Sequence, residues 1–181
     1  MSLPNLISLA RLLAVPFAVY LIIEGEFAAA FWLFVAAGAS DAVDGFLAKR
    51  LGMQSDLGSY LDPLADKALL VGVYVALGHG GHIPTWLVIL VVFRDILIVG
   101  GVILIFLING SGAARPLYIS KINTAAQITL VAFVLAALGF GADAGVWLEF
   151  LVWLVAATTV LSGGGYLVNW ARQTRGVETL R

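Results

Sequence analysis

Four aspartates lie close together in an otherwise strongly apolar sequence. They are Asp41, Asp44, Asp62 and Asp66, within the stretch SDAVDGFLAKRLGMQSDLGSYLDPLADK at residues 40–67. A carboxylate at the depth of the bilayer hydrocarbon costs about 2.5–3.5 kcal/mol on insertion scales. Four such carboxylates need compensating charges, and the kind of compensation indicates the chemistry of this stretch.

The spacing of the aspartates predicts two pairs at matched depths on a helical hairpin. Asp41 and Asp44 are three residues apart, so they share one face of a helix. Asp62 and Asp66 are four residues apart and share a face of the next helix in the same way. Counted from Met53 in the expected turn, all four lie roughly 14–20 Å away at 1.5 Å per residue. The hairpin therefore brings the carboxylates together toward one side of the membrane.

The charge of this cluster predicts a site for divalent metal ions. Four carboxylates without cations would be pushed toward protonation, and the nearby Lys49, Arg50 and Lys67 compensate them only in part. Two divalent cations would balance the charge, and an all-oxygen ligand set selects Mg²⁺ or Mn²⁺. Two such ions about 3.5–4 Å apart form a clamp for in-line displacement at phosphorus. The small residues Gly45 and Ala48 would leave room for a bulky ligand there.

The composition of the chain predicts an all-α integral membrane protein. Of its 181 residues, 61% are hydrophobic and 12% are charged, whereas a soluble domain is nearer a quarter charged. The absence of cysteine excludes disulfides and thiolate metal sites. A membrane-spanning helix needs about 20 apolar residues. Six runs in a single domain over residues 1–181 meet this requirement: 5–23, 27–49, 58–78, 83–108, 118–139 and 145–170.

The basic residues predict how these six spans are oriented. One set of connections carries Lys49, Arg50, Arg115 and Lys121, and three further arginines lie near the C-terminal end. The opposite connections hold acidic residues and histidines but no Lys or Arg. Because basic residues favour the cytoplasmic side, we expect both termini and the aspartate site to face the cytoplasm. The expected location is the inner membrane of a bacterium.

Two alternatives compete with a catalytic interpretation of the aspartates. A single intramembrane aspartate is often a structural group in an ion pair, but four in a matched hairpin are hard to explain that way. A divalent-cation transporter would place carboxylates near the midplane, often in related repeat halves. Here the carboxylates lie toward one side, in one hairpin and without a repeat. The pattern therefore favours an enzyme over a transporter.

The aspartate stretch resembles the signature of the CDP-alcohol phosphotransferases, also called CDP-alcohol phosphatidyltransferases. That signature, D-x2-D-G-x2-A-R-x8-G-x3-D-x3-D, is filled with the correct spacing from Asp41 to Asp66, but Lys49 stands where the family has arginine. Lysine keeps the charge but cannot reproduce bidentate phosphate binding. The resemblance implies six transmembrane helices in a homodimer, an active site open to the cytoplasm, membrane lipids as partners and no nucleic acid.

The resemblance also implies a reaction and the residues that perform it. A phosphatidyl group would pass from CDP-diacylglycerol to an acceptor hydroxyl, and CMP would leave. Asp66 would be both a metal ligand and the general base, and Asp41, Asp44 and Asp62 would be metal ligands. Arg11, whose alternative is a side chain that snorkels to water, would help to close the site. The implied contacts to the CDP group are Asn5, Arg11, Asp41, Gly45, Ala48, Lys49 and Gly58.

A polar segment at the start of the 118–139 run indicates where the acceptor binds. Ser120, Lys121, Asn123 and Gln127 form a face that we expect to point into the bundle, with helix–helix hydrogen bonding as the alternative. The sequence ISKINTAAQ in this segment and the sequence FRDILIVGG in the preceding apolar run resemble those of the cardiolipin synthases of the family. The acceptor of these enzymes is phosphatidylglycerol. The phosphatidylglycerophosphate synthases, which use glycerol 3-phosphate, have a similar Lys/Thr/Gln set and remain the alternative. The expected acceptor contacts are Lys121, Asn123, Gln127, Arg172 and Arg94.

The adjacent Arg94 and Asp95 are a second charged feature inside an apolar run. They correspond to an arginine/glutamate pair of the phosphatidylglycerophosphate synthases. Neighbouring residues of a helix point in different directions, so an ion pair between them would need further partners.

Overall fold

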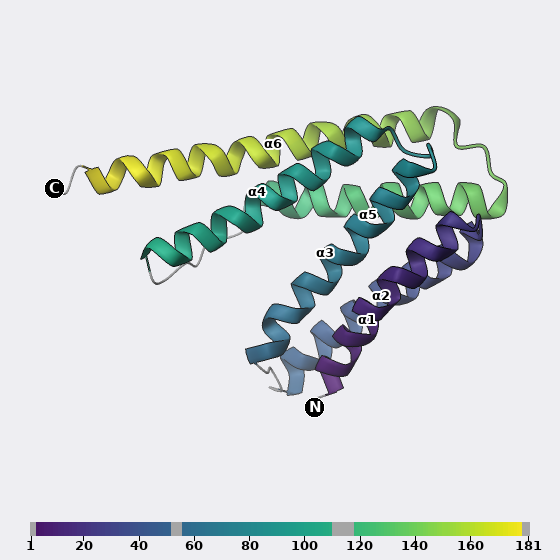
Figure 1. The fold of residues 1–181 in the computed structure, drawn as a ribbon, viewed down its shortest axis with the longest axis horizontal. Coiled ribbons are helices and arrows are strands. Elements are labelled where there is room, and N and C mark those ends of the chain that lie inside the picture. The colour runs from purple at the N-terminus through teal and green to yellow at the C-terminus, as the bar shows by residue number, and fades with distance from the viewer. Residues whose placement is uncertain (1–2, 52–55, 110–117, 179–181) are drawn as a thin grey trace. The chain divides into compact units, whose positions relative to one another are not determined.

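Six α-helices account for most of the described chain (Figure 1). The computed structural model describes the backbone of residues 3–51, 56–109 and 118–178, and the side chains of residues 9–40, 65, 67–101 and 118–168. Each predicted apolar run corresponds to one helix. The helices are α1 (Leu3–Ile23), α2 (Phe27–Leu51), α3 (Asp56–His79), α4 (Thr85–Asn109), α5 (Tyr118–Phe140) and α6 (Gly145–Glu178).

Helix α6 continues beyond residue 170, where the sequence predicted its end. It has 34 residues, or about 51 Å at 1.5 Å per residue, which exceeds the ~30 Å of a bilayer's hydrocarbon core. No proline interrupts it, and residues 171–178 are mostly compatible with helix despite their polarity. The apolar run therefore ends before the helix does. Arg172 lies in the polar extension of the helix beyond this run.

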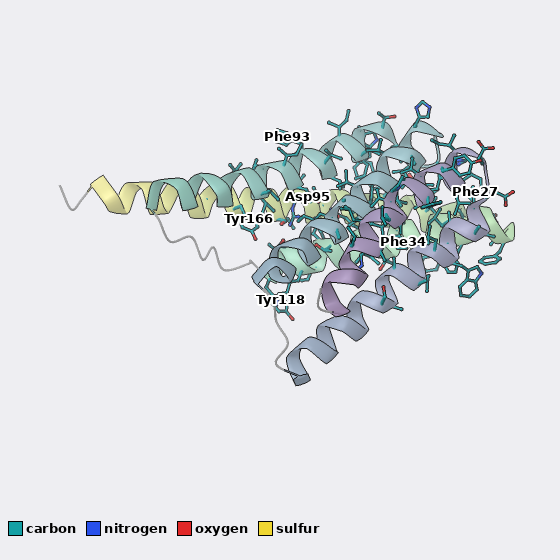
Figure 2. All side chains as sticks on the ribbon, turned by 60° about the horizontal axis from the view of Figure 1, so that its bottom comes forward. Phe27, Phe34, Phe93, Asp95, Tyr118 and Tyr166 are labelled. Carbon is teal, nitrogen blue, oxygen red and sulfur yellow. The ribbon has the colours of Figure 1, made fainter. Side chains whose placement is uncertain are left out.

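The apolar helices agree with a membrane protein. Within the part of the chain whose side chains are described, Tyr118–Phe140 and Gly145–Val168 are long and apolar enough to cross a membrane. Large apolar side chains also point outward, with Trp147 69% exposed and Phe93 63% exposed. Figure 2 shows Phe93 on the outer side of α4. Exposed apolar surface of this kind marks contact with lipid or with another protein.

The chain divides into two compact units, each of which combines separate parts of the sequence. Helix α5 is shared, because its second half belongs to the first unit and its first half to the second. The first unit contains Met1–Ile83 and Val131–Gly145, and the second contains Pro84–Leu130 and Val146–Arg181.

Small residues allow close helix packing in the first unit. Helix α1 packs against both α2 and α3. A Cβ atom on Gly72 of α3 would lie 3.0 Å from Val15 Cγ1 of α1, and one on Gly139 of α5 would lie 2.7 Å from both the backbone nitrogen and Cα of Ala28. Leu77, which follows Gly72 by five residues in α3, is completely buried. Small residues at helix contacts are typical of helix association in membranes.

The second unit consists of α4, the first half of α5 and most of α6. Its apolar core includes the fully buried side chains of Leu87, Val91 and Val155. The rings of Trp86 and Trp153 pack at a centroid distance of 5.5 Å and join α4 to α6. This unit also buries a set of polar side chains, which are described below.

Candidate functional site

The four aspartates of the predicted metal site lie on consecutive helices of the first unit. Asp41 and Asp44 are in α2, and Asp62 and Asp66 are in α3. The connection between these helices, residues 52–55, lies where the sequence predicted the turn. The expected helical hairpin is therefore confirmed for the described backbone, whereas the side chains of the four aspartates lie outside the described residues.

The helix bounds place the outer aspartates at equal distances from this connection. Asp41 lies ten residues before the end of α2, and Asp66 lies ten residues after the start of α3. Ten residues correspond to about 15 Å along each helix axis. Figure 1 shows the end of α2, the start of α3 and the start of α1 at the same end of this unit. The backbone thus brings the two aspartate pairs to similar depths, as the spacing predicts.

The aspartate hairpin fits a site for hard divalent cations. Spacings of three and four residues in the observed helices place each pair on one helix face. Carboxylate oxygens are the ligands that Mg²⁺ and Mn²⁺ prefer. Among the side chains that the structure describes, no group of three or more His, Cys, Asp or Glu gathers elsewhere. The hairpin is therefore the candidate metal centre, and the ligand roles stay predictions.

The predicted contacts to the CDP group belong to the same unit. Asn5 and Arg11 lie in α1, and Arg11 is only 3% exposed. A snorkelling side chain would leave its guanidinium group in water, so the burial of Arg11 argues against that alternative. The other predicted contacts lie in the parts of α2 and α3 near their connection; they are Asp41, Gly45, Ala48, Lys49 and Gly58.

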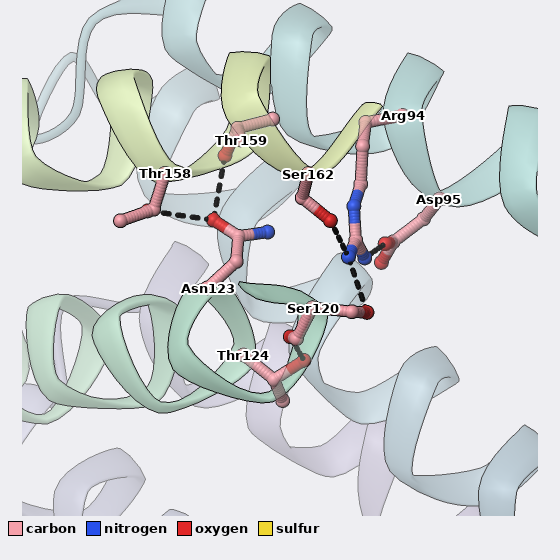
Figure 3. Close-up of polar contacts among 8 residues, drawn as sticks. All are labelled: Arg94, Asp95, Ser120, Asn123, Thr124, Thr158, Thr159 and Ser162. Carbon is pink, nitrogen blue, oxygen red and sulfur yellow. Dashed lines mark hydrogen bonds and ion pairs between the residues drawn. The ribbon is translucent and has the colours of Figure 1, made fainter. Parts of the chain in front are cut away.

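A cluster of polar side chains fills part of the core of the second unit (Figure 3). Arg94 of α4 donates from Nη1 to Asp95 Oδ1 at 2.6 Å. Its Nη2 donates to the hydroxyl oxygens of Ser120 in α5 and Ser162 in α6, both at 2.5 Å. Arg94 and Asp95 are 3% and 6% exposed. The long arginine side chain thus reaches its sequence neighbour, and the serines of two other helices are the further partners that the pair was expected to need.

A second set of hydrogen bonds joins α5 to α6 one turn further along α5. The hydroxyl groups of Thr158 and Thr159 donate to Asn123 Oδ1, both at 2.9 Å. Asn123 is fully buried, and its Nδ2 has no hydrogen-bond partner among the described residues. The alternative of helix–helix hydrogen bonding is therefore confirmed for Oδ1 of Asn123.

Helix α6 contributes polar residues to this core that were not among the predicted site residues. Thr158, Thr159 and Ser162 are buried, and Ser162 follows the two adjacent threonines by four and three residues in an otherwise apolar run. This spacing matches the face of α5 that contains Ser120 and Asn123. Hydroxyl residues at helical spacing inside an apolar run were the sequence feature that could have indicated this buried polar face.

The predicted polar face of α5 is confirmed only in part. Asn123 and Gln127 are buried and Ser120 is half-buried, but Lys121 is exposed. The expectation that Lys121 points into the bundle with them is therefore wrong, because a step of one residue turns a helix by about 100°. The proposed roles of Lys121, Asn123, Gln127 and Arg172 in acceptor binding stay predictions, and the side chain of Arg172 lies outside the described residues.

Comparisons with known proteins identify a family and two kinds of relative. The pattern of the CDP-alcohol phosphatidyltransferase family matches residues 1–161. The chain is 38% identical over 193 residues to the chloroplastic CDP-diacylglycerol–glycerol-3-phosphate 3-phosphatidyltransferase 1 of Oryza sativa subsp. japonica, covering 97% of this chain and 58% of the relative. It is 35% identical over 189 residues to the cardiolipin synthase (CMP-forming) of Homo sapiens, covering 96% of this chain and 62% of the relative.

A shorter bacterial relative matches over almost its whole length. The CDP-diacylglycerol–glycerol-3-phosphate 3-phosphatidyltransferase of Bacillus subtilis (strain 168) is 32% identical over 190 residues, covering 93% of this chain and 95% of the relative. By contrast, the chain spans only about three fifths of the length of the rice and human proteins, as their 58% and 62% coverage shows.

Proposed function

Because the chain belongs to the CDP-alcohol phosphatidyltransferase family, we propose that it transfers a phosphatidyl group from CDP-diacylglycerol to an acceptor hydroxyl and releases CMP. The observation that carries this proposal is the family signature from Asp41 to Asp66, which lies on α2 and α3 with its outer aspartates equidistant from the connection. The signature is complete except for Lys49. The names of the rice, human and bacterial relatives describe enzymes of this reaction class.

The proposed setting is a bacterial inner membrane. All six helices would cross the bilayer, with both termini and the aspartate hairpin on the cytoplasmic side, in a homodimer of single-domain chains. Support comes from the two long apolar helices and from the connections between the predicted spans, of which only one set carries Lys or Arg.

The aspartates Asp41, Asp44, Asp62 and Asp66 would hold two Mg²⁺ or Mn²⁺ ions. When bound, these ions supply electrostatic stabilisation of the charge that develops on the phosphoryl oxygens. The all-carboxylate donor set and its register on two helices support this assignment.

The chain's own residues would position the CDP group and move one proton. Gly45 and Ala48 would let the CDP group lie against the backbone of α2, and Lys49 would contact its phosphates. The Asp66 carboxylate would accept the proton of the acceptor hydroxyl. The hydroxyl oxygen then forms a bond to the phosphorus of the phosphatidyl group, and the bond from that phosphorus to the bridging oxygen of the pyrophosphate breaks. CMP leaves with the bridging oxygen.

Phosphatidylglycerol is the acceptor that we propose, with cardiolipin as the product. The segment 119–127 resembles cardiolipin synthases, and the human relative carries that name. The alternative acceptor is glycerol 3-phosphate, because the rice and Bacillus relatives are named for it. The proposed acceptor contacts are Lys121, Gln127, Arg172 and Nδ2 of Asn123, which has no hydrogen-bond partner among the described residues. Arg94, for which the sequence predicted a direct contact, is left out of this set because its guanidinium group already has three partners.

An assay with each acceptor separately tests both the reaction class and the identity of the acceptor. Purified chain in mixed micelles is incubated with Mg²⁺, CDP-diacylglycerol and either phosphatidylglycerol or glycerol 3-phosphate. CMP and the lipid product are then measured by mass spectrometry. We expect cardiolipin and CMP with phosphatidylglycerol. Product only with glycerol 3-phosphate would contradict the cardiolipin assignment, and no CMP with either acceptor would contradict the reaction class.

A further inference from the structure

One guanidinium group connects all three helices of the second unit. Both hydrogens of Arg94 Nη2 are used, because this atom donates to Ser120 of α5 and to Ser162 of α6. Its Nη1 donates to Asp95 on the same helix. Figure 3 shows the guanidinium group between the two serines and the aspartate. Arg94 is therefore attached to α5 and α6 at the same time.

The polar contacts hold α5 at two points on one face. Ser120 and Asn123 are three residues apart on α5, so they lie on the same side of the helix. Ser120 is held through Arg94, and Asn123 Oδ1 accepts hydrogen bonds from Thr158 and Thr159 of α6. Rotation of α5 about its axis would break both attachments, so together they determine which side of α5 faces outward.

The outward side of α5 includes Lys121. This residue follows Ser120 directly, which places it about 100° further around the helix, and its side chain is exposed. Ile122 is 45% exposed, whereas Ala126 is 8% exposed. Lys121 is thus held outside the buried face by the attachment of its neighbour.

We infer that Arg94 is a positioning residue: it sets the rotation of α5 and so presents Lys121 to the acceptor's phosphate, without touching the acceptor. The role of Lys121 rests on the proposed function, but the control of the rotation of α5 does not. A bidentate contact from both Nη atoms of Arg94 to a phosphate would have to displace a serine hydroxyl group, because both hydrogens of Nη2 are used. Two N–H groups remain, one on Nη1 beside Asp95 and one on Nε, and Nε is buried.

The rotation of α5 can be measured without any assay of activity. The chain has no cysteine, so Lys121→Cys and Ala126→Cys each introduce a single thiol that a methanethiosulfonate reagent labels in detergent. With the contacts intact, we expect labelling at 121 to be about tenfold faster than at 126, because an exposed group reacts without local opening. In the Ser120→Ala/Ser162→Ala background only the attachment through Asn123 remains, so we expect the ratio of the two labelling rates to fall well below this value. An unchanged ratio would overturn the inference.

The control for this experiment is Thr129→Ala. Thr129 is an exposed residue of α5, and its hydroxyl group donates only to the Ala125 carbonyl oxygen of the same helix, at 2.8 Å. With Thr129→Ala, we expect the ratio of the labelling rates at positions 121 and 126 to stay the same as without this substitution. The double serine variant keeps the ion pair of Arg94 with Asp95. If that variant does not fold, Arg94→Lys replaces it, because one ammonium group beside Asp95 cannot reproduce the fork that reaches both serines.

A kinetic measurement separates positioning from direct contact. If Arg94 acts through α5, Ser120→Ala/Ser162→Ala raises the KM for the acceptor by about tenfold, since misplacement of a binding group is costly. The KM for CDP-diacylglycerol stays within about twofold. If Arg94 binds the acceptor itself, the serine variant leaves the acceptor KM unchanged or lowers it, while Arg94→Lys raises it; that pattern would overturn the inference. Loss of all transfer by the unmodified chain would contradict the proposed function and leave the labelling result intact.

Discussion

The two units of the chain bury different kinds of side chain. In the first unit the described core is largely apolar, with Leu77 fully buried and Gly139 close to the backbone of Ala28. Among the described side chains, every buried polar or charged residue except Arg11 belongs to the second unit. The reaction signature, however, lies on α2 and α3 of the first unit. The unit with the more polar described core is therefore not the one with the candidate metal centre.

This difference separates two uses of polar groups in a membrane protein. Polar groups away from water must find partners within the protein, and the second unit supplies them from neighbouring helices. Arg94 is paired with Asp95, and Asn123 Oδ1 has two hydroxyl donors. The stretch of residues 40–67 instead has five carboxylates, those of the four aligned aspartates and of Asp56, and only three basic residues. An excess of like charge indicates a ligand site, whereas matched pairs indicate helix packing.

The largest expected effect is the loss of turnover in Asp66→Asn. The amide keeps the shape of the side chain but cannot accept the acceptor's proton, so we expect kcat to fall by at least about 100-fold. CMP release measures this loss. Binding of CDP-diacylglycerol, followed by the ligand-dependent shift in Tm, should largely survive. Asp143→Asn is the control, because Asp143 is an exposed residue of the same unit that accepts a hydrogen bond from Gly145 N at 3.0 Å. Full activity in Asp66→Asn would exclude Asp66 as the base.

The next largest effect concerns the buried ion pair of the second unit. Asp95→Asn leaves the Arg94 guanidinium buried without its counter-charge, so we expect the free energy of unfolding to fall by about 3 kcal/mol. The measurement is an SDS unfolding titration in mixed micelles. Arg94→Met/Asp95→Leu removes both charges and should recover much of the loss. If the double variant is less stable than Asp95→Asn, the pair does not act as a matched unit.

A change in the first unit tests its close packing. In Gly139→Ala the new Cβ would lie 2.7 Å from the backbone of Ala28, and backbone cannot move aside cheaply. We expect a loss of about 2 kcal/mol in the free energy of unfolding, as overpacking typically causes. Gly38→Ala is the matched control in α2, since its Cβ would meet no described atom within 4 Å. Equal stability of the two variants would show that the contact at Gly139 is not tight.

The smallest effect is expected for Asn123→Ala. The substitution removes the acceptor of the Thr158 and Thr159 hydroxyl groups, but Thr158 also has carbonyl partners within α6. Hydrogen bonds between membrane helices contribute about 0.6 kcal/mol on average, so we expect a loss of about 1 kcal/mol by the same unfolding titration. Thr129→Ala should change stability less. A loss as large as that of Asp95→Asn would contradict this order, because Asn123 would then contribute as much to stability as the ion pair.

The sequence predicted the helices and the signature better than it predicted the polar core. Apolar runs determine where helices can lie in a membrane, so each run became a helix. Residues 171–178 are polar yet helical, so hydropathy alone underestimated α6. Asp41 and Asp66 could be matched in depth because helical rise alone determines that relation.

The contacts of the second unit depend on features that sequence spacing does not determine. The pairing of Arg94 with Asp95 depends on a side-chain conformation, and its bonds to Ser120 and Ser162 depend on how three helices are rotated. The same rotation decides that Lys121 is exposed while Asn123 is buried. A face assigned by spacing alone could not distinguish these two residues, because they are close in sequence and both polar.

The central claim is that the chain transfers a phosphatidyl group by means of the aspartate hairpin, and CMP release tests it most directly. The unmodified chain is given CDP-diacylglycerol, Mg²⁺ and both acceptors together, and CMP is quantified with and without EDTA. The account predicts CMP in amounts equal to the lipid product when Mg²⁺ is present, and none when EDTA has removed it. No CMP with Mg²⁺ and both acceptors, or undiminished release in EDTA, would contradict it.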